Sequence, residues 1–150
     1  MEARDHGTSV DEYVRFRAYG NQLIDVHLRL REMLEDLREG VPPEAELGVH
    51  CLAFCAAVTR HHTAEDTGVF PILAARYPEL RDFLAGLERD HVVIAGMLTR
   101  LSAWACEPAG PGGRAELDGL AAVLETHFIG EEKRLAKVLD ALEPADGINF

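Results

Sequence analysis

The chain has 150 residues, 47% of them hydrophobic, which suits one domain with a core that needs no disulfide bonds. Its formal net charge of −11 argues against nucleic acid and against anionic membranes as partners, since both attract basic surfaces. No run of about 18 apolar residues is present, and residues 1–10 lack the pattern of a signal peptide, so we expect neither a transmembrane span nor a secretory signal.

Hydrophobic residues recur at three- and four-residue steps in four long segments, which predicts four amphipathic helices. The first is expected over residues 11–39, with Gly40 as its C-terminal cap. The second is expected over residues 44–66. Gly68 and Pro71 should disturb its end and leave a further turn over residues 72–76.

The third helix is expected over residues 79–106 and the fourth over residues 115–142. Between them, residues 108–113 (Pro-Ala-Gly-Pro-Gly-Gly) predict a loop. Residues 1–10 and 143–150 are expected to be flexible tails. Four long helices with short connections favour an all-α, up-down-up-down antiparallel four-helix bundle over residues 11–142.

Two of the predicted helices contain the same short pattern, a His with a Glu four residues later and a second acid directly after it. The two stretches are His61-His62-Thr63-Ala64-Glu65-Asp66 and His127-Phe128-Ile129-Gly130-Glu131-Glu132. Residues four apart lie on the same face of a helix. Each stretch can therefore direct one imidazole and one carboxylate at the same point.

One histidine from each helix is predicted to fall in a single layer of the bundle. The four are His27, His61, His91 and His127. At about 1.5 Å per residue, each lies roughly 20 to 24 Å from the same end of an up-down-up-down bundle. Four imidazoles and two carboxylates facing a core are costly to bury unpaired, and a metal pair satisfies them together. The spacing therefore predicts a carboxylate-bridged metal pair in the core.

Over about residues 20–140 the chain resembles the hemerythrin-like, or HHE cation-binding, family. The family signature is a His on helix one, HxxxE on helix two, a His on helix three, and HxxxE or HxxxxD/E on helix four. The matching stretches are Val26-His27, His61 to Glu65 and on to Phe70-Pro71, Arg89-Asp90-His91, and His127 to Glu131-Glu132. The resemblance implies a hemerythrin-like four-helix bundle around a non-haem diiron centre.

The resemblance also implies roles for individual residues. His27 and His61 would bind one iron, His91 and His127 the other, and Glu65 and Glu131 would bridge the two. The remaining bridge between the iron ions (Fe2+/Fe3+) would be an oxo, hydroxo or water ligand. Iron is implied by the resemblance alone, because zinc or manganese also suits His and Glu ligands.

The chain departs from the oxygen-carrying hemerythrins at Leu87, where those proteins have a further His one turn before the residue matching His91. One iron therefore loses a protein ligand unless His62, Glu88 or a water replaces it. On the helix His62 points about 100° away from His61, which favours an outer-face or ligand-orienting role.

The acids beside the two motifs leave further alternatives open. Asp66 is interpreted as solvated or as orienting a ligand. The same interpretation applies to Glu132, which is also the alternative to Glu131 as a bridge. His50 lies roughly 16 Å from His61 along the helix, too far to share the site, and is expected to be buried and hydrogen-bonded.

The remaining residues with chemical character are given structural roles. The cysteines Cys51, Cys55 and Cys106 fit no zinc or redox motif and are interpreted as buried small side chains, with a redox or metal-supporting role as the alternative. Their number suits a reducing cytoplasm. The aromatic residues Tyr13, Tyr19 and Trp104 are interpreted as packing or interface residues. The small size permits a homodimer.

These expectations converge on a small cytoplasmic diiron protein that binds or reacts with O2, NO or peroxide. No general base or nucleophile stands out beyond the ligands, so the sequence names no organic substrate. Two alternatives stay open. One is an iron or oxygen sensor or a metal store without turnover, and the other is a diiron oxidase or oxygenase of a biosynthetic pathway.

Overall fold

The computed structural model describes residues 10–40, 46–105 and 111–140, and every regular element within these ranges is helical. The predicted tails lie outside the described residues, except for Val10, the first residue of the first helix. The chain divides into two compact units, residues 1–28 with 128–150 and residues 29–127. None of the helices in the described ranges is both long enough and apolar enough to cross a membrane.

Four long helices follow one another, as the hydrophobic repeats predict. The elements are α1 (Val10–Glu39), α2 (Leu47–Ala64), the π-helical turn η3 (Glu65–Val69), α3 (Phe70–Arg76), the 3-10 turn η4 (Pro78–Leu80), α4 (Arg81–Ala105) and α5 (Pro111–Asp140). The predicted cap at Gly40 is confirmed: its φ of 69° is left-handed, and its N–H donates to the Leu37 carbonyl at 3.3 Å.

The second predicted helix continues beyond residue 66 instead of breaking near Gly68. A single π-helical turn, η3, joins α2 to α3, and the Phe70 N–H donates to the carbonyl of Glu65, five residues back. Pro71 has no N–H and would clash with the carbonyl four residues before it in a regular α-helix. The wider π turn accommodates this proline, and the helix ends at Arg76, with Tyr77 as its C-cap directly before Pro78.

The predicted loop over residues 108–113 is shorter than expected. Helix α5 begins at Pro111, so Gly112 and Gly113 are helical. The fixed φ of proline suits the first position of a helix, where the missing N–H has no intrahelical partner to lose. Residues 108–110 lie outside the described residues.

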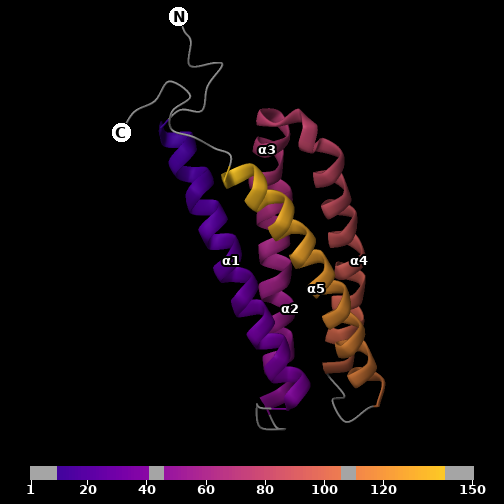
Figure 1. Ribbon diagram of the computed structural model, residues 1–150. Helices are drawn as coiled ribbons and strands as arrows, with labels where there is room; N and C mark the ends of the chain where they lie inside the picture. The colour runs from indigo at the N-terminus through magenta and orange to yellow at the C-terminus, as the bar shows by residue number, and fades with distance from the viewer. Residues whose placement is uncertain (1–9, 41–45, 106–110, 141–150) are drawn as a thin grey trace, which may run out of the picture. The chain divides into compact units, whose positions relative to one another are not determined.

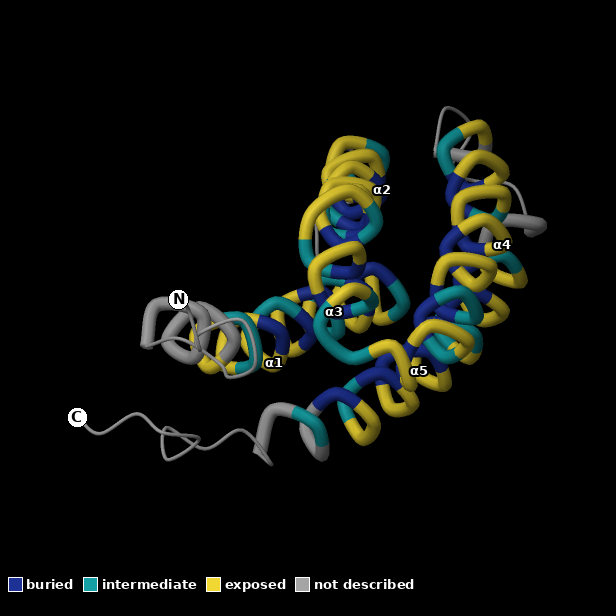
Figure 2. Tube along the Cα trace, turned by 90° about the horizontal axis from the view of Figure 1, so that it is seen from above, coloured by how far each residue is buried: buried dark blue, intermediate teal, exposed yellow. Residues whose placement is uncertain are grey.

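The unit of residues 29–127 contains parts of all four long helices. Within it α2 packs against α4, and the two lie side by side in Figure 1. Figure 2 shows buried and exposed residues alternating along these helices, as expected when each buries one side. The core of this unit includes Leu34, Phe54, Val58, Ile94, Leu101, Leu120 and Leu124.

Ion pairs on the surface of the same unit connect α1 and α4 to α5. Arg31 Nε lies 2.8 Å from Glu125 Oε1, and Arg38 Nε lies 3.2 Å from Asp118 Oδ1. Arg100 of α4 pairs with Glu116 at 3.2 Å. Exposed pairs of this kind contribute little to stability. They do show that the second half of α1 and the helix α4 both border the first half of α5.

The other unit pairs the first part of α1 with the last part of α5. Its buried side chains include Leu23 and His27 from α1, and Phe128 and Leu135 from α5. The rings of His27 and Phe128 stack with centroids 3.9 Å apart. Each helix therefore buries one face in this unit, and each of these faces includes polar residues.

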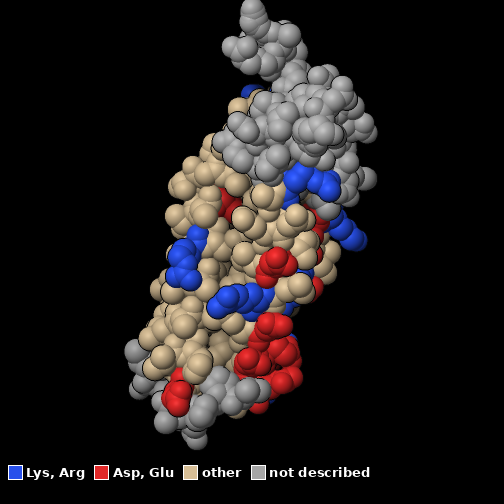
Figure 3. Space-filling view, turned by 90° about the vertical axis from the view of Figure 1, so that its left-hand side faces the viewer, with Lys and Arg blue, Asp and Glu red and all other residues tan. Residues whose placement is uncertain are grey.

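Both signs of charge occur on the surface. Figure 3 shows acidic side chains gathered toward the lower end of the displayed face and basic ones elsewhere on it. Near the end of α1, a hydrogen bond with Glu35 raises the pKa of the Glu39 carboxyl. This crowding of acids reflects the overall charge of −11.

Candidate metal centre

Glu65 lies between two histidines in the unit of residues 29–127. It is the first residue of the π turn and is almost fully buried. Its Oε2 lies 3.4 Å from Nε2 of His61, and its Oε1 lies 3.4 Å from Nε2 of His91. The two oxygens of one buried carboxylate thus face imidazoles on opposite sides. A carboxylate that bridges two metal ions presents its oxygens in this way.

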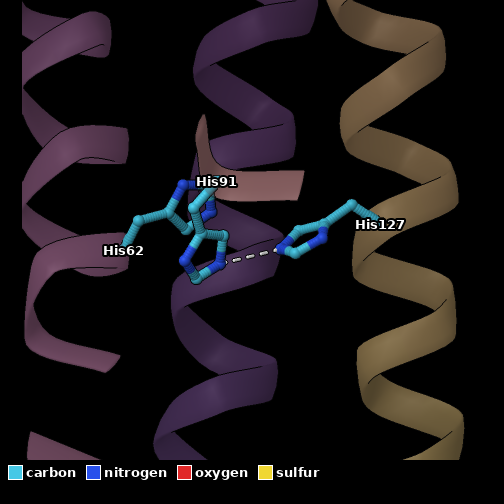
Figure 4. A group of neighbouring side chains, drawn as sticks. All are labelled: His62, His91 and His127. Carbon is cyan, nitrogen blue, oxygen red and sulfur yellow. Dashed lines mark hydrogen bonds between the residues drawn. The ribbon is translucent and has the colours of Figure 1, made fainter. Parts of the chain in front are cut away.

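A group of three imidazoles, which includes His91, lies beside Glu65. His62 of α2, His91 of α4 and His127 of α5 are all buried, and each offers a nitrogen within 4.8 Å of the others (Figure 4). The Nε2 atoms of His91 and His127 are 3.2 Å apart. Two nitrogens about 2.0–2.1 Å from a single metal ion are about 2.9–3.4 Å apart. The His91–His127 separation therefore fits two ligands of one ion.

The outer nitrogens of the same imidazoles face carboxylates. Nδ1 of His91 lies 2.8 Å from Asp66 Oδ1, and Nδ1 of His127 lies 3.0 Å from Asp90 Oδ2. When Nδ1–H donates to a carboxylate, Nε2 carries the lone pair that a metal ion needs. The two acids therefore favour the tautomer in which both Nε2 atoms act as ligands.

The same arrangement recurs in the other unit, around His27. This ring is fully buried, and its Nε2 lies 3.3 Å from Oε1 of the buried Glu131. Its Nδ1 lies 2.6 Å from Oε2 of Glu132. The Tyr19 hydroxyl donates to Glu131 Oε2 over 3.5 Å. Glu131 thus faces the ligand nitrogen of His27, and Glu132 orients the ring.

The structure brings together most of the residues singled out in the sequence, within their own units. His61, Glu65, His91 and His127 lie together in residues 29–127, and His27 lies with Glu131 in the other unit. The place of His27 in a common layer of four histidines stays a prediction.

The flanking residues divide into those near the imidazoles and those at the surface. Asp66 and Glu132 each meet the Nδ1 of a histidine, and His62 is buried against His91. Glu88 is exposed. The expectation that His50 is buried is wrong: it is exposed and lies 3.7 Å from Glu46 one turn earlier, because its side of α2 faces solvent.

Two residues near the histidines were given no role at the site from the sequence. Asp90 reaches from α4 to His127 on α5, and its signal was its position directly before His91. Tyr19, interpreted as a packing residue, contacts Glu131 through its hydroxyl. Cross-helix partners of this kind have no sequence spacing that marks them.

Cys51 and Cys55 are buried as predicted, and Cys106 lies outside the described residues. A hydrogen bond from Cys51 lowers the pKa of the Cys55 thiol to about 7, although burial opposes this shift. The same contact raises the pKa of Cys51. Cys55 also lines a groove between α2 and α4 that is bordered by Leu52, Thr59, Leu98 and Ser102. None of the candidate metal ligands lines this groove.

The chain matches one family model and no individual protein in the comparisons made. Residues 21–139 match the family model described as the Hemerythrin HHE cation binding domain. No curated protein and no solved structure matches the chain. The matched range includes all the candidate ligands, from His27 to Glu131, and the acids that contact their histidines.

Proposed function

We propose, since the chain belongs to the hemerythrin HHE cation-binding family, that it holds two iron ions in its helical core and binds or reacts with O2, NO or peroxide there. The observation that carries this proposal is the position of Glu65. One buried carboxylate faces His61 with one oxygen and His91 with the other, at 3.4 Å each. Two ion positions, one on each side of Glu65, account for a buried acid placed between two buried or nearly buried imidazoles.

The proposed ligands follow the family pattern. His27 and His61 would hold one ion, His91 and His127 would hold the other, and Glu65 and Glu131 would serve both. Support within residues 29–127 comes from the 3.2 Å separation of the His91 and His127 nitrogens. In the other unit, support comes from Glu131, which faces Nε2 of a fully buried His27. Imidazole and carboxylate ligands suit iron.

The side chains around the proposed ligands orient the imidazoles and shield them from water. Asp66, Asp90 and Glu132 hold Nδ1 of three imidazoles and so fix the direction of Nε2. Phe70 stacks near His91 and Phe128 stacks on His27, and these rings exclude water from the imidazoles. The bound ions would supply a change of oxidation state and open coordination positions.

The proposed partner is a small molecule, and the proposed location is the cytoplasm. The negative charge opposes nucleic acid and anionic membrane as partners. Storage or sensing of iron without turnover is the alternative within the same metal-binding class. An oxidase or oxygenase of a biosynthetic pathway is a further alternative, which requires an organic substrate.

The first experiment measures the metal content per chain, together with the optical spectrum, after anaerobic iron loading. The wild-type protein should take up two iron ions and, after exposure to air, show near-ultraviolet absorption from ligand-to-iron charge transfer. A His61→Ala/His127→Ala variant should lose both signals, and His50→Ala, an exposed histidine on the same helix as His61, should keep them.

Steady-state decay of peroxide or NO by the loaded protein then separates reaction from storage. Decay that requires the bound iron supports a reactive centre. Stable binding without decay favours storage or sensing. A wild-type protein that binds no metal would contradict the proposal, and the histidines would then serve only the fold.

A further inference from the structure

The position at which a third histidine is expected for one ion is apolar in this chain. Leu87 lies one turn before His91 on α4 and is 4% exposed, so it packs in the core and offers no ligand atom. Glu88, the next residue, is exposed. Helix α4 therefore supplies a single imidazole, His91, to the proposed centre.

We propose that His62, from α2, supplies the third imidazole to the ion held by His91 and His127. This inference rests on the proposed function, because it concerns the same centre. It assigns a ligand to a helix other than the one on which the family pattern places it.

The burial of His62 and its ring contacts place it beside His91 and His127. His62 is buried, whereas the adjacent His61 is only partly buried. The His62 ring stacks on His91 with centroids 3.8 Å apart and an interplanar angle of 10°. It meets His127 edge to face at 5.2 Å. Figure 4 shows the His62 ring against the His91 ring, with His127 directed at them from α5.

The two neighbouring histidines of α2 lie on different sides of the Glu65 carboxylate. Consecutive residues on a helix point about 100° apart. His61 lies on the Oε2 side of Glu65, and the His91 imidazole, on which His62 stacks, lies on the Oε1 side. The pair His61-His62 thus provides one imidazole to each side of the same carboxylate.

The ligand nitrogens of the three histidines lie near one another but not yet at the spacing that one ion requires. One nitrogen from each of His62, His91 and His127 lies within 4.8 Å of the others. Because the stacked, nearly parallel rings of His62 and His91 cannot both direct a nitrogen at one ion, His62 would turn out of the stack to bring its nitrogen to the separation of about 3 Å that a shared ion needs. Three helices, α2, α4 and α5, then contribute one imidazole each.

An exchange of residues between positions 62 and 87 tests this inference. The variants are His62→Leu, the swap His62→Leu/Leu87→His, and His50→Ala as the control on the same helix. Each is titrated with Co2+ and with Fe2+ without oxygen, and the visible absorption of bound Co2+ reports the coordination number. Far-UV circular dichroism of the metal-free variants checks the fold, and the apolar leucine keeps position 62 packed.

The wild type and His50→Ala should bind two ions per chain. In His62→Leu, the affinity for one of the two ions should fall by at least roughly 10- to 100-fold. That is the loss expected when a residue that only orients a metal ligand is removed. The Co2+ spectrum of this variant should change for that ion alone. The swap should restore the affinity for the weakened ion, because a histidine at position 87 lies one turn before His91 on the same face of α4.

Two outcomes separate this inference from the function on which it rests. If a folded His62→Leu binds both ions with wild-type affinity and spectrum, His62 is a packing residue and the inference is wrong. If the wild type itself binds no metal, the proposed function fails first. A His62→Leu protein that loses affinity without rescue by the swap would also overturn the inference, because the loss would then follow from packing.

Discussion

Three buried imidazoles share one arrangement at the level of single side chains. In each, Nδ1 faces a carboxylate and Nε2 faces the interior; the pairs are His27–Glu132, His91–Asp66 and His127–Asp90. A histidine ligand whose second nitrogen is held in this way has a fixed ring direction and a more basic ligand nitrogen. The arrangement explains why acids directly follow both HxxxE motifs.

Asp90 offers the clearest test of this role, because its side chain is about half exposed and contributes little to the core. Asp90→Asn should lower metal affinity by roughly 10- to 100-fold while leaving the metal-free protein folded, since the amide binds His127 less strongly than a carboxylate does. Competition with a chelator of known affinity measures this change.

Glu88→Gln is the matched control for Asp90→Asn. It removes a negative charge from an exposed residue two positions earlier on α4. If both variants lose affinity equally, the effect is one of net charge, and Asp90 has no specific role. A loss confined to Glu88→Gln would instead favour Glu88 as the replacement for the missing ligand.

Helix boundaries, unlike the helices themselves, depend on local backbone geometry that the hydrophobic pattern does not contain. The repeats located all four long helices, because burial of one face determines their spacing. They did not reveal that Pro111 would start α5 or that a π turn would carry the helix through Pro71. Both prolines were interpreted as breaks, whereas each occupies a helical position in which its missing N–H is tolerated.

Two glycines at different points of the helices should respond in opposite directions to alanine. Gly40 ends α1 with φ of 69°, and an added Cβ would meet nothing within 4 Å, so its cost is purely conformational. Gly40→Ala should destabilise the fold by about 1–2 kcal/mol. Gly96, inside α4 and equally unobstructed, should give about 0.5–1 kcal/mol of stabilisation as alanine.

Urea unfolding of the two glycine variants beside the wild type measures both differences on one scale. The sign of the change in the free energy of unfolding is the informative result, because it depends on backbone conformation and on no side-chain contact. A stabilising Gly40→Ala would show that the left-handed cap is not required at the end of α1.

For the molecule as a whole, the sequence predicted which motif histidines lie together better than it predicted their further partners. Counting along the helices selected His61, His91 and His127, and the structure places them around Glu65. The packing of His62 against His91 could not be counted, because it depends on how far α2 and α4 rotate as they pack. Sequence spacing fixes positions along a helix, and packing fixes the direction in which neighbouring residues point.

The buried acids and imidazoles also predict a link between metal binding and the stability of the whole fold. An ion that binds only the folded state, at a free concentration 100-fold above its Kd, adds about 2.7 kcal/mol to the free energy of unfolding. For a chain of this size this raises the Tm by roughly 5–10 °C. Thermal unfolding with iron and with a chelator, each without oxygen, measures the shift.

The His61→Ala/His127→Ala variant should have the same Tm with iron as with chelator, because its ligand set is incomplete on both sides of Glu65. An equal shift in this variant would place the stabilising ions elsewhere in the chain. The far-UV circular dichroism of the chelated wild type then distinguishes two kinds of protein. Retained helicity indicates a preformed centre suited to reaction, whereas lost helicity means that folding itself depends on the metal, as a metal sensor requires.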